Sequence, residues 1–348
     1  MIVIGAGAAG IFAALAAAEQ GADVLLFEKN DIVGKKMGIT GKGRCNLTNT
    51  CPMADFIART PGHGKFLFSA YQAYTNEDLL NQVHAWGLAT KEERGGRVFP
   101  QSDSAIEVRK LLYHRLQAAK VDLHLQEPVR AVHHAASGFT VQTGRGTYEA
   151  GACIITTGGV SYPVTGSSGD GYEFAKALGH TVTELRPSLI AFTASDAWVR
   201  DLAGLALRNV DVSLWKQGKK LASQFGEMLF THTGVSGPVI LMLSSAVAHK
   251  PKWTFPMQLR INLKPALTAD ALDARVQRDF QKYLRKQVDN ALKELLPQHL
   301  IPVVLDQAGI AKETPVNQIT RIQRQDLVTV LQALSLTLTG TRPIAEAI

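Results

Sequence analysis

The fold is decided by residues 1–21, which read MIVIGAGAAGIFAALAAAEQG. Residues 2–4 form a short β-branched run that predicts a buried parallel strand leading straight into a glycine-rich turn. Gly5 permits a tight turn, Gly7 lets the backbone approach a pyrophosphate, and Gly10 allows the following helix to pack closely on the strand. Because a helix N-terminus offers free N–H donors and a partial positive charge, strand, turn and helix together predict a dinucleotide site.

An acidic residue follows at the distance that such a site requires. The next apolar run, residues 23–27, predicts a second strand, and it ends in Glu28, 23 residues after Gly5. A carboxylate at this point accepts hydrogen bonds from ribose hydroxyls. The alternative, a tight turn in an unrelated α/β unit, leaves Gly10 and Glu28 unexplained.

A second glycine-rich segment, residues 34–46, reads GKKMGITGKGRCN. Its four glycines let backbone amides converge, and its four cations, together with Thr40 and Asn46, offer further donors. Such a loop suits a long anionic cofactor that extends beyond its adenosine half, which favours FAD over NAD. The alternative is a flexible, solvated basic loop.

Length and composition limit the class of protein. With 348 residues, 46% of them hydrophobic and 19% charged, the chain can bury a sizeable core, which excludes an intrinsically disordered or fibrous protein. Its formal charge of +7 favours anionic partners without specifying a fold. The three cysteines cannot form a disulfide framework and include no CxxC pair, so we expect no metal site and a reducing, cytoplasmic setting. No apolar stretch is long enough to predict a membrane span.

The second loop also carries a resemblance to a known family. Glu28 and the later run GKKMGITGKGRCNLTN resemble the signature of the HI0933-like flavoproteins, also called the YhiN or BaiN family of FAD-dependent oxidoreductases. Residues 154–159, 161–172 and 229–238 continue the family pattern, so the similarity spans essentially the whole chain. The resemblance implies an α/β fold, with a Rossmann-like FAD-binding domain and an inserted β-plus-helical substrate domain.

The resemblance also implies a set of FAD contacts. These are Gly5, Gly7, Ala9 and Gly10 at the pyrophosphate, Glu28 at the adenosine ribose, Lys35, Lys36, Thr40, Gly41, Gly43, Arg44 and Asn46 in the second loop, Val129 at the adenine, and Thr157, Gly158 and Gly159 after a later strand. Asp170 has two interpretations, binding the ribityl hydroxyls or capping the next helix, and capping is favoured.

The pattern of predicted strands and helices changes near residue 189. Residues 1–188 alternate predicted strands and helices and are expected to form the FAD-binding domain. Residues 189–334 read first as strands and then as helices, and are expected to form the substrate domain. An amphipathic pattern over residues 271–296 predicts one helix of about seven turns. Residues 335–348 are expected to return to the FAD-binding domain.

No catalytic residue is specified, because a flavin performs the redox step itself while the protein positions the substrate. Cys45 lies beside Arg44 in a loop whose positive charge would lower the pKa of the thiol. It has no CxxC partner, so packing beside FAD is preferred to a redox role. His232 is another weak candidate: it could protonate or orient a substrate, or form a hydrogen bond within a turn, and both alternatives stay open.

The predicted function is FAD-dependent oxidation or reduction of an unidentified small molecule. A single GxGxxG motif leaves two reductants open, NAD(P)H docking transiently or the substrate itself. One alternative is a flavoprotein that binds or modifies RNA, motivated by basic residues along the predicted long helix, although a solvated face is preferred. These residues are Arg275, Arg278, Lys282, Arg285, Lys286 and Lys293. A further alternative is a truncated, catalytically silent relative.

The chain departs from the family pattern at its end. Ile348 follows closely on residues 337–341, where family members continue into a further Gly- and Asp-containing segment that closes on FAD. We therefore expect weakened retention of FAD by this chain.

Overall fold

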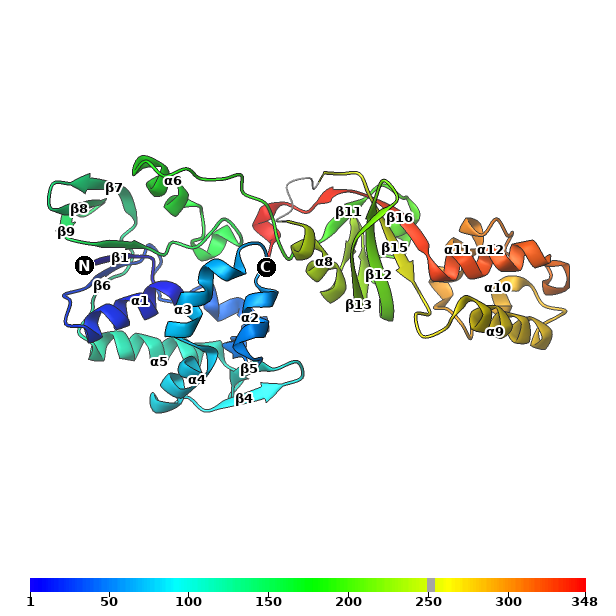
Figure 1. The fold of residues 1–348 in the computed structure, drawn as a ribbon, viewed down its shortest axis with the longest axis horizontal. Coiled ribbons are helices and arrows are strands. Elements are labelled where there is room, and N and C mark those ends of the chain that lie inside the picture. Colours follow the sequence, from blue (N-terminus) through cyan, green and yellow to red (C-terminus); the bar gives the residue numbers. More distant parts are fainter. Residues whose placement is uncertain (249–253) are drawn as a thin grey trace. The chain divides into compact units, whose positions relative to one another are not determined.

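The computed structural model describes residues 1–248 and 254–348, which pack into two compact units (Figure 1). Unit 1 is Met1–Leu185 and unit 2 is Arg186–Ile348. This division lies close to residue 188, the boundary expected from the change in the pattern of predicted strands and helices.

Unit 1 is built on a four-stranded parallel sheet with the strand order β10-β1-β2-β6. The strands are β1 (Ile2–Ile4), β2 (Leu25–Phe27), β6 (Asp122–His124) and β10 (Cys153–Ile155). All of β1 is buried, in agreement with its apolar, β-branched sequence. Ile4 lies opposite both Phe27 and Ile155, so the carboxyl ends of these three strands are aligned. The residues that follow them therefore meet at one edge of the sheet, where open α/β folds bind ligands.

Helices and two small antiparallel sheets surround this sheet. Helices α1 (Ala8–Glu19) and α5 (Ala105–Ala118) share one hydrophobic core with it (Figure 1). One small sheet has the order β3-β5-β4 and the other β7-β8-β9. The remaining elements are β3 (Thr48–Asn49), α2 (Met53–Arg59), α3 (Phe68–Ala73), α4 (Asn76–Ala85), β4 (Thr90–Glu93), β5 (Arg97–Pro100), β7 (Val129–Ala135), β8 (Gly138–Thr143), β9 (Thr147–Ala150) and α6 (Asp170–Ala177).

Unit 2 combines a closed barrel with a group of helices. The barrel has the strand order β11-β14-β13-β12-β15-β16. Its strands are β11 (Phe192–Ala194), β12 (Ala206–Lys216), β13 (Lys219–Thr231), β14 (Gly234–Ser236), β15 (Met257–Asn262) and β16 (Leu334–Thr341). The helices are α7 (Trp198–Asp201), α8 (Pro238–Ala248), α9 (Ala269–Lys282), α10 (Val288–Ala291), α11 (Ile301–Gln307) and α12 (Arg321–Gln332). The predicted fold class, an α/β protein with a Rossmann-type sheet and a β-plus-helical part, is confirmed.

The last residues of the chain belong to a different unit from the one expected. Instead of returning to the Rossmann part, residues 334–341 form β16, which closes the barrel by pairing with β15 and β11. The alternating residues Leu334, Leu336 and Leu338 are buried in the core of unit 2, and this burial fixes the strand in the barrel.

The long helix predicted over residues 271–296 is also divided. Helix α9 ends at Lys282, and α10 begins only at Val288. The backbone N–H of Val288 donates to the carbonyl oxygen of Thr314, and the N–H of Val316 donates to that of Lys286. These long-range hydrogen bonds replace the ones that a continuous helix would need at this point.

The described residues contain neither a membrane-spanning helix nor a cluster of metal-ligating side chains. Within residues 1–248 and 254–348, no helix is both long enough and apolar enough to cross a membrane. In the same ranges, no three His, Cys, Asp or Glu side chains gather to form a metal site.

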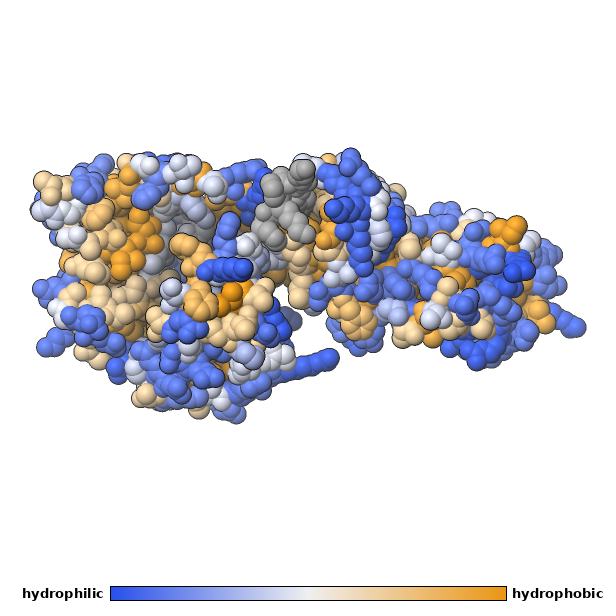
Figure 2. All heavy atoms as spheres, in the orientation of Figure 1, coloured by the Kyte–Doolittle hydropathy of each residue, from blue (hydrophilic) through white to orange (hydrophobic). Residues whose placement is uncertain are grey.

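Figure 2 shows many hydrophilic residues over the helices of unit 2, as expected for helices that bury one apolar stripe.

Candidate functional site

The turn between β1 and α1 has the geometry that the glycine spacing predicts. Gly5 adopts φ +101°, and a Cβ atom there would lie 2.6 Å from the carbonyl oxygen of Thr156. A Cβ at Gly10 would lie 1.8 Å from the carbonyl oxygen of Gly5, so only glycine fits at these two positions. A Cβ at Gly7, in contrast, would meet nothing within 4 Å. Space is therefore left before the start of α1, whose first N–H groups have no side-chain cap.

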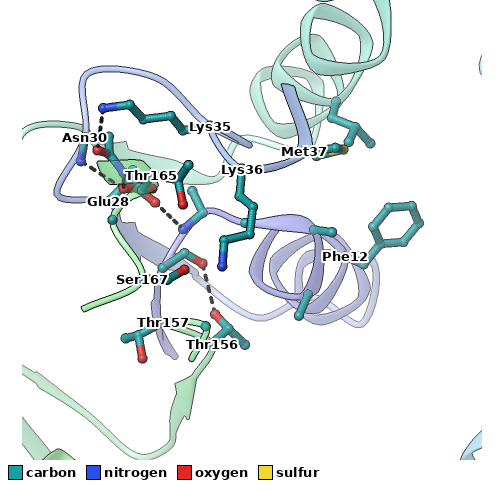
Figure 3. A pocket seen from close by; sticks show the side chains of 18 of the residues that line it. Phe12, Glu28, Asn30, Lys35, Lys36, Met37, Thr156, Thr157, Thr165 and Ser167 are labelled. Carbon is teal, nitrogen blue, oxygen red and sulfur yellow. Dashed lines mark hydrogen bonds between the residues drawn. The ribbon is translucent and has the colours of Figure 1, made fainter. Parts of the chain in front are cut away.

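The buried carboxylate of Glu28 lies beside this turn. Its Oε2 accepts a hydrogen bond of 2.8 Å from the N–H of Ala6, and its Oε1 accepts bonds of 2.8 and 2.6 Å from the backbone N–H and the Nδ2 of Asn30. Oε2 keeps capacity for a further donor. Asn30 was not predicted from the sequence, although an amide two residues after the acid is a signal that could have identified it. Asn30 also donates to the carbonyl oxygen of Thr165 and accepts from Lys35 (Figure 3).

Two lysines attach the loop after β10 to the segment after β2. Lys36 Nζ donates to the carbonyl oxygen of Ser161 over 2.8 Å, and burial lowers the pKa of this lysine. Lys29 Nζ lies 2.6 Å from Asp170 Oδ2 and also donates to the hydroxyl of Ser168. Burial alone would raise the pKa of Asp170, but hydrogen bonds from Lys29 and Ser168 outweigh it and lower that pKa. Asp170 is the first residue of α6 and its carboxylate pairs with Lys29, while its two predicted roles, capping the helix or binding the ribityl hydroxyls, stay predictions.

These elements enclose a cavity of about 630 Å³ in unit 1. It collects most of the predicted FAD contacts from the glycine turn, the second loop and the loop after β10. The predicted residues on its wall are Gly5, Gly7, Ala9, Glu28, Lys35, Lys36, Thr40, Asn46, Val129, Thr157, Gly158 and Asp170. The predicted residues that do not line it are Gly10, Gly41, Gly43, Arg44 and Gly159.

Two of the predicted residues that do not line the cavity, Gly10 and Arg44, make other contacts. Gly10 packs against Gly5, at a distance too short to admit a side chain. The guanidinium of Arg44 lies 2.7 Å from Glu93 Oε1 and stacks over the ring of Phe99, 4.1 Å from its centroid. Arg44 therefore joins the second loop to the small β3-β5-β4 sheet, and its contact with FAD stays a prediction.

The two weak catalytic candidates lie in different surroundings. Cys45 lines the cavity, but its side chain is buried and burial raises the pKa of the thiol. The expected lowering of the pKa by a positive loop is wrong, because burial of the thiol outweighs the lowering effect of its hydrogen bond with Thr40. His232 lies in unit 2, on the turn between β13 and β14, where it is exposed, and it is not part of the cavity in unit 1.

Comparison with known families accounts for the combination of this glycine turn, a buried acid and a glycine-rich second loop. The family model described as "HI0933-like protein Rossmann domain" matches residues 1–337. The chain belongs to this family. HI0933-like proteins are FAD-dependent flavoprotein oxidoreductases with a Rossmann domain, and FAD is accordingly the cofactor of the class to which this chain belongs.

Three relatives of known name share most of the length of this HI0933-like chain. It is 30% identical over 354 residues to the 3-dehydro-bile acid delta(4,6)-reductase of Clostridium scindens, covering 99% of this chain and 84% of that protein. It is 30% identical over 335 residues to the ribosomal RNA dihydrouridine synthase of Escherichia coli, covering 95% and 79%. The protein of the same name from Haemophilus influenzae is 28% identical over 347 residues, covering 98% and 82%.

The cavity of this HI0933-like chain fits the polar half of FAD. The open space at Gly7 admits a pyrophosphate to the start of α1. The carboxylate of Glu28 lines the cavity and has acceptor capacity for a ribose hydroxyl. Lys35 and Lys36 add positive charge to the same wall, which favours an anionic cofactor.

Proposed function

We propose that the chain reduces a carbon–carbon double bond that is conjugated with a carbonyl group, with FAD as the electron carrier. The names of the relatives support this reaction type. A delta(4,6)-reductase acting on a 3-dehydro bile acid and a synthase of dihydrouridine both add two hydrogen atoms across such a bond. The observation that carries the proposal for this chain is the cavity that joins the glycine turn, Glu28 and the second loop.

In this proposal the chain's own residues bind and orient the cofactor. The N–H groups at the start of α1 would donate to the pyrophosphate, and Glu28 Oε2 would accept from a ribose hydroxyl. Lys36, held by Ser161, would keep the loop after β10 closed over the cavity. Once reduced by NAD(P)H, the bound FAD would supply a hydride to one carbon of the double bond, and a proton from solvent would add to the other carbon. The protein therefore contributes position, charge and exclusion of water, in keeping with the absence of a predicted acid–base pair.

The reductant is proposed to be NAD(P)H, docking transiently. The sequence contains one GxGxxG motif, so a second Rossmann site for the nicotinamide is not expected. A second organic substrate that is oxidised by FAD, and so supplies the two electrons for the double bond, is the alternative. The three cysteines, all unpaired, support the reducing, cytoplasmic setting expected from the sequence.

Reduction of uridine within RNA is a second candidate, favoured by the names of two relatives. Two of the basic residues of α9, Arg275 and Lys282, give it little support, because they have acidic partners. Arg275 lies 2.9 Å from Asp279 and Lys282 lies 2.6 Å from Glu294. A small conjugated carbonyl compound is therefore the substrate that we propose first, with RNA as the alternative.

Anaerobic spectroscopy tests the reaction. The FAD-loaded protein is reduced with NADH or NADPH and then mixed with a cyclic conjugated ketone, an isolated alkene or uridine-containing RNA. We expect the oxidised flavin spectrum to return with the conjugated ketone and a product that gains two hydrogen atoms. Return of the spectrum with RNA alone, with steep dependence on salt, would establish the second candidate. No reoxidation by any of the three compounds would refute the proposal.

A further inference from the structure

The cavity of unit 1 has a second end that is chemically unlike the first. Six residues from α1, the second loop, α4 and α5 define what we call the apolar lobe: Phe12, Met37, Leu79, Val83, Val108 and Leu111. None of the cavity-lining residues contributed by α4 and α5 is charged. The lobe and the polar wall belong to one cavity, so a molecule in the lobe would lie next to one bound at the glycine turn.

The two ends are separated along the cavity. Figure 3 shows Glu28, Asn30 and Lys35 together on one side of Lys36, with Phe12 and Met37 on the other side. The groups suited to a ribose therefore lie away from the lobe.

The apolar lobe reaches into the hydrophobic core of unit 1. Val83 and Val108 are each only 2% exposed, and all six lobe residues belong to that core or pack against it. Protein cores are close-packed, so an apolar space within one is costly when empty. Apolar cavities of this kind exclude water and take up hydrophobic molecules. A nucleotide would leave its polar groups without partners in such surroundings.

A tyrosine near the lobe adds a hydroxyl group to the cavity wall. Tyr74 lines the cavity, is 42% exposed, and places its ring centroid 6.4 Å from that of Phe12. Its hydroxyl donates to Gln82 in this structure. Burial, followed by the charges of Asp78 and Glu19, raises the pKa of Tyr74, so the hydroxyl stays a proton donor at neutral pH. If this hydroxyl turned from Gln82 to a ligand, it would donate its one hydrogen to the carbonyl group of a compound in the lobe.

We propose that the apolar lobe is a second binding site, for an uncharged hydrophobic ring compound that binds beside FAD and whose conjugated double bond is reduced. The identity of this compound as the substrate rests on the function proposed above, whereas its binding does not. The site selects against RNA, because none of the six lobe residues offers a cation or a side-chain donor to a phosphate.

Equilibrium dialysis with N-phenyl-1-naphthylamine, an uncharged aromatic probe, tests the site on FAD-free and FAD-loaded protein. We expect one probe per chain and the same affinity in both states. Val83→Phe fills the lobe and should weaken probe binding by about tenfold or more while leaving the affinity for FAD unchanged. Ala85→Phe is the matched control, because it adds the same ring on the exposed side of α4 and should change neither affinity.

Three results would overturn the inference. Displacement of the probe by FAD would mean that the isoalloxazine ring takes the lobe. Unchanged probe binding by Val83→Phe would place the probe elsewhere. If Val83→Phe does not fold, Val83→Ala enlarges the lobe and should strengthen probe binding, and an unchanged affinity would again contradict the site. The probe needs no turnover, so these failures are distinct from a failure of the flavin assay, which would leave the binding site intact.

Discussion

Replacing Gly7 by alanine should separate cofactor binding from folding. At Gly7 a Cβ atom meets no atom within 4 Å, and the φ of −78° is open to any residue. Alanine makes a poorer N-cap than glycine but restricts the unfolded chain, and these opposing effects of about 0.5–1 kcal/mol nearly cancel. The added methyl group would occupy the space through which a pyrophosphate approaches the start of α1.

The expected loss of FAD affinity follows from the hydrogen bonds at that helix end. A hydrogen bond to a charged group contributes about 1.5–3 kcal/mol, and each 1.4 kcal/mol is a factor of ten in affinity. Losing one such bond to the pyrophosphate therefore weakens FAD binding about 10- to 100-fold. Titration with FAD, followed by flavin fluorescence, measures the affinity, and thermal unfolding of the FAD-free protein should give a Tm within about 4 °C of the parent.

Gly10→Ala is the contrasting variant. Its Cβ would lie 1.8 Å from the carbonyl oxygen of Gly5, so it should lower the stability by about 3 kcal/mol or more. The reasoning is refuted if Gly7→Ala binds FAD as tightly as the parent chain. It is also refuted if Gly10→Ala is as stable as Gly7→Ala.

Four further variants test the site. Asn30→Ala removes the 2.6 Å hydrogen bond to Glu28 and should weaken FAD binding about tenfold in the same titration. Arg44→Ala should lower the Tm but leave FAD affinity within about threefold, because Arg44 is directed to Glu93 and Phe99; a larger loss would restore its predicted contact. Iodoacetamide should label buried Cys45 more slowly than half-buried Cys51, as followed by mass spectrometry with Cys51→Ser as control; equal rates would contradict the raised pKa. Asp170, with its pKa lowered by Lys29 and Ser168 against the effect of burial, stabilises the fold above about pH 4 and loses this contribution as the pH falls through the lowered pKa. Asp170→Asn should therefore lower the Tm at neutral pH and lessen its fall on acidification, and parallel Tm profiles would argue against the ion pair.

The sequence predicted those parts of the site that depend on local geometry. Gly10 is required by its contact with Gly5 within one strand–turn–helix unit, and Gly5 adopts a φ of +101° in the same turn, so the glycine spacing indicates the turn. The contact between Gly5 and Thr156, in contrast, joins distant segments and is not visible in the sequence. Glu28 follows directly from the end of the next strand. The sequence predicts the contacts of the cations less well. Nothing near Arg44 in the sequence indicates that its guanidinium will pair with Glu93 and stack on the ring of Phe99.

Long-range pairing explains the two errors about unit 2. The alternating leucines of residues 334–338 identify a strand, but only the partners β11 and β15 decide to which sheet it belongs. The apolar spacing of residues 271–296 is helical throughout, yet hydrogen bonds to residues 314–316 interrupt the helix near Gln287. Both outcomes depend on backbone contacts between segments far apart in the chain.

The ties made by Lys29, Asn30 and Lys36 have a consequence for dividing the protein into fragments. Each tie joins side chains or backbone separated by 125 to 141 residues. A break in the chain anywhere between β3 and β9 would therefore divide the lining of the cofactor cavity between the two fragments. The strand pairing of β1 with β10 would be a contact that reunites them wherever the break lies in this range. Recovery of the flavin spectrum on mixing would then report reassembly of the Rossmann sheet itself, so the cofactor serves as a built-in reporter for a split protein.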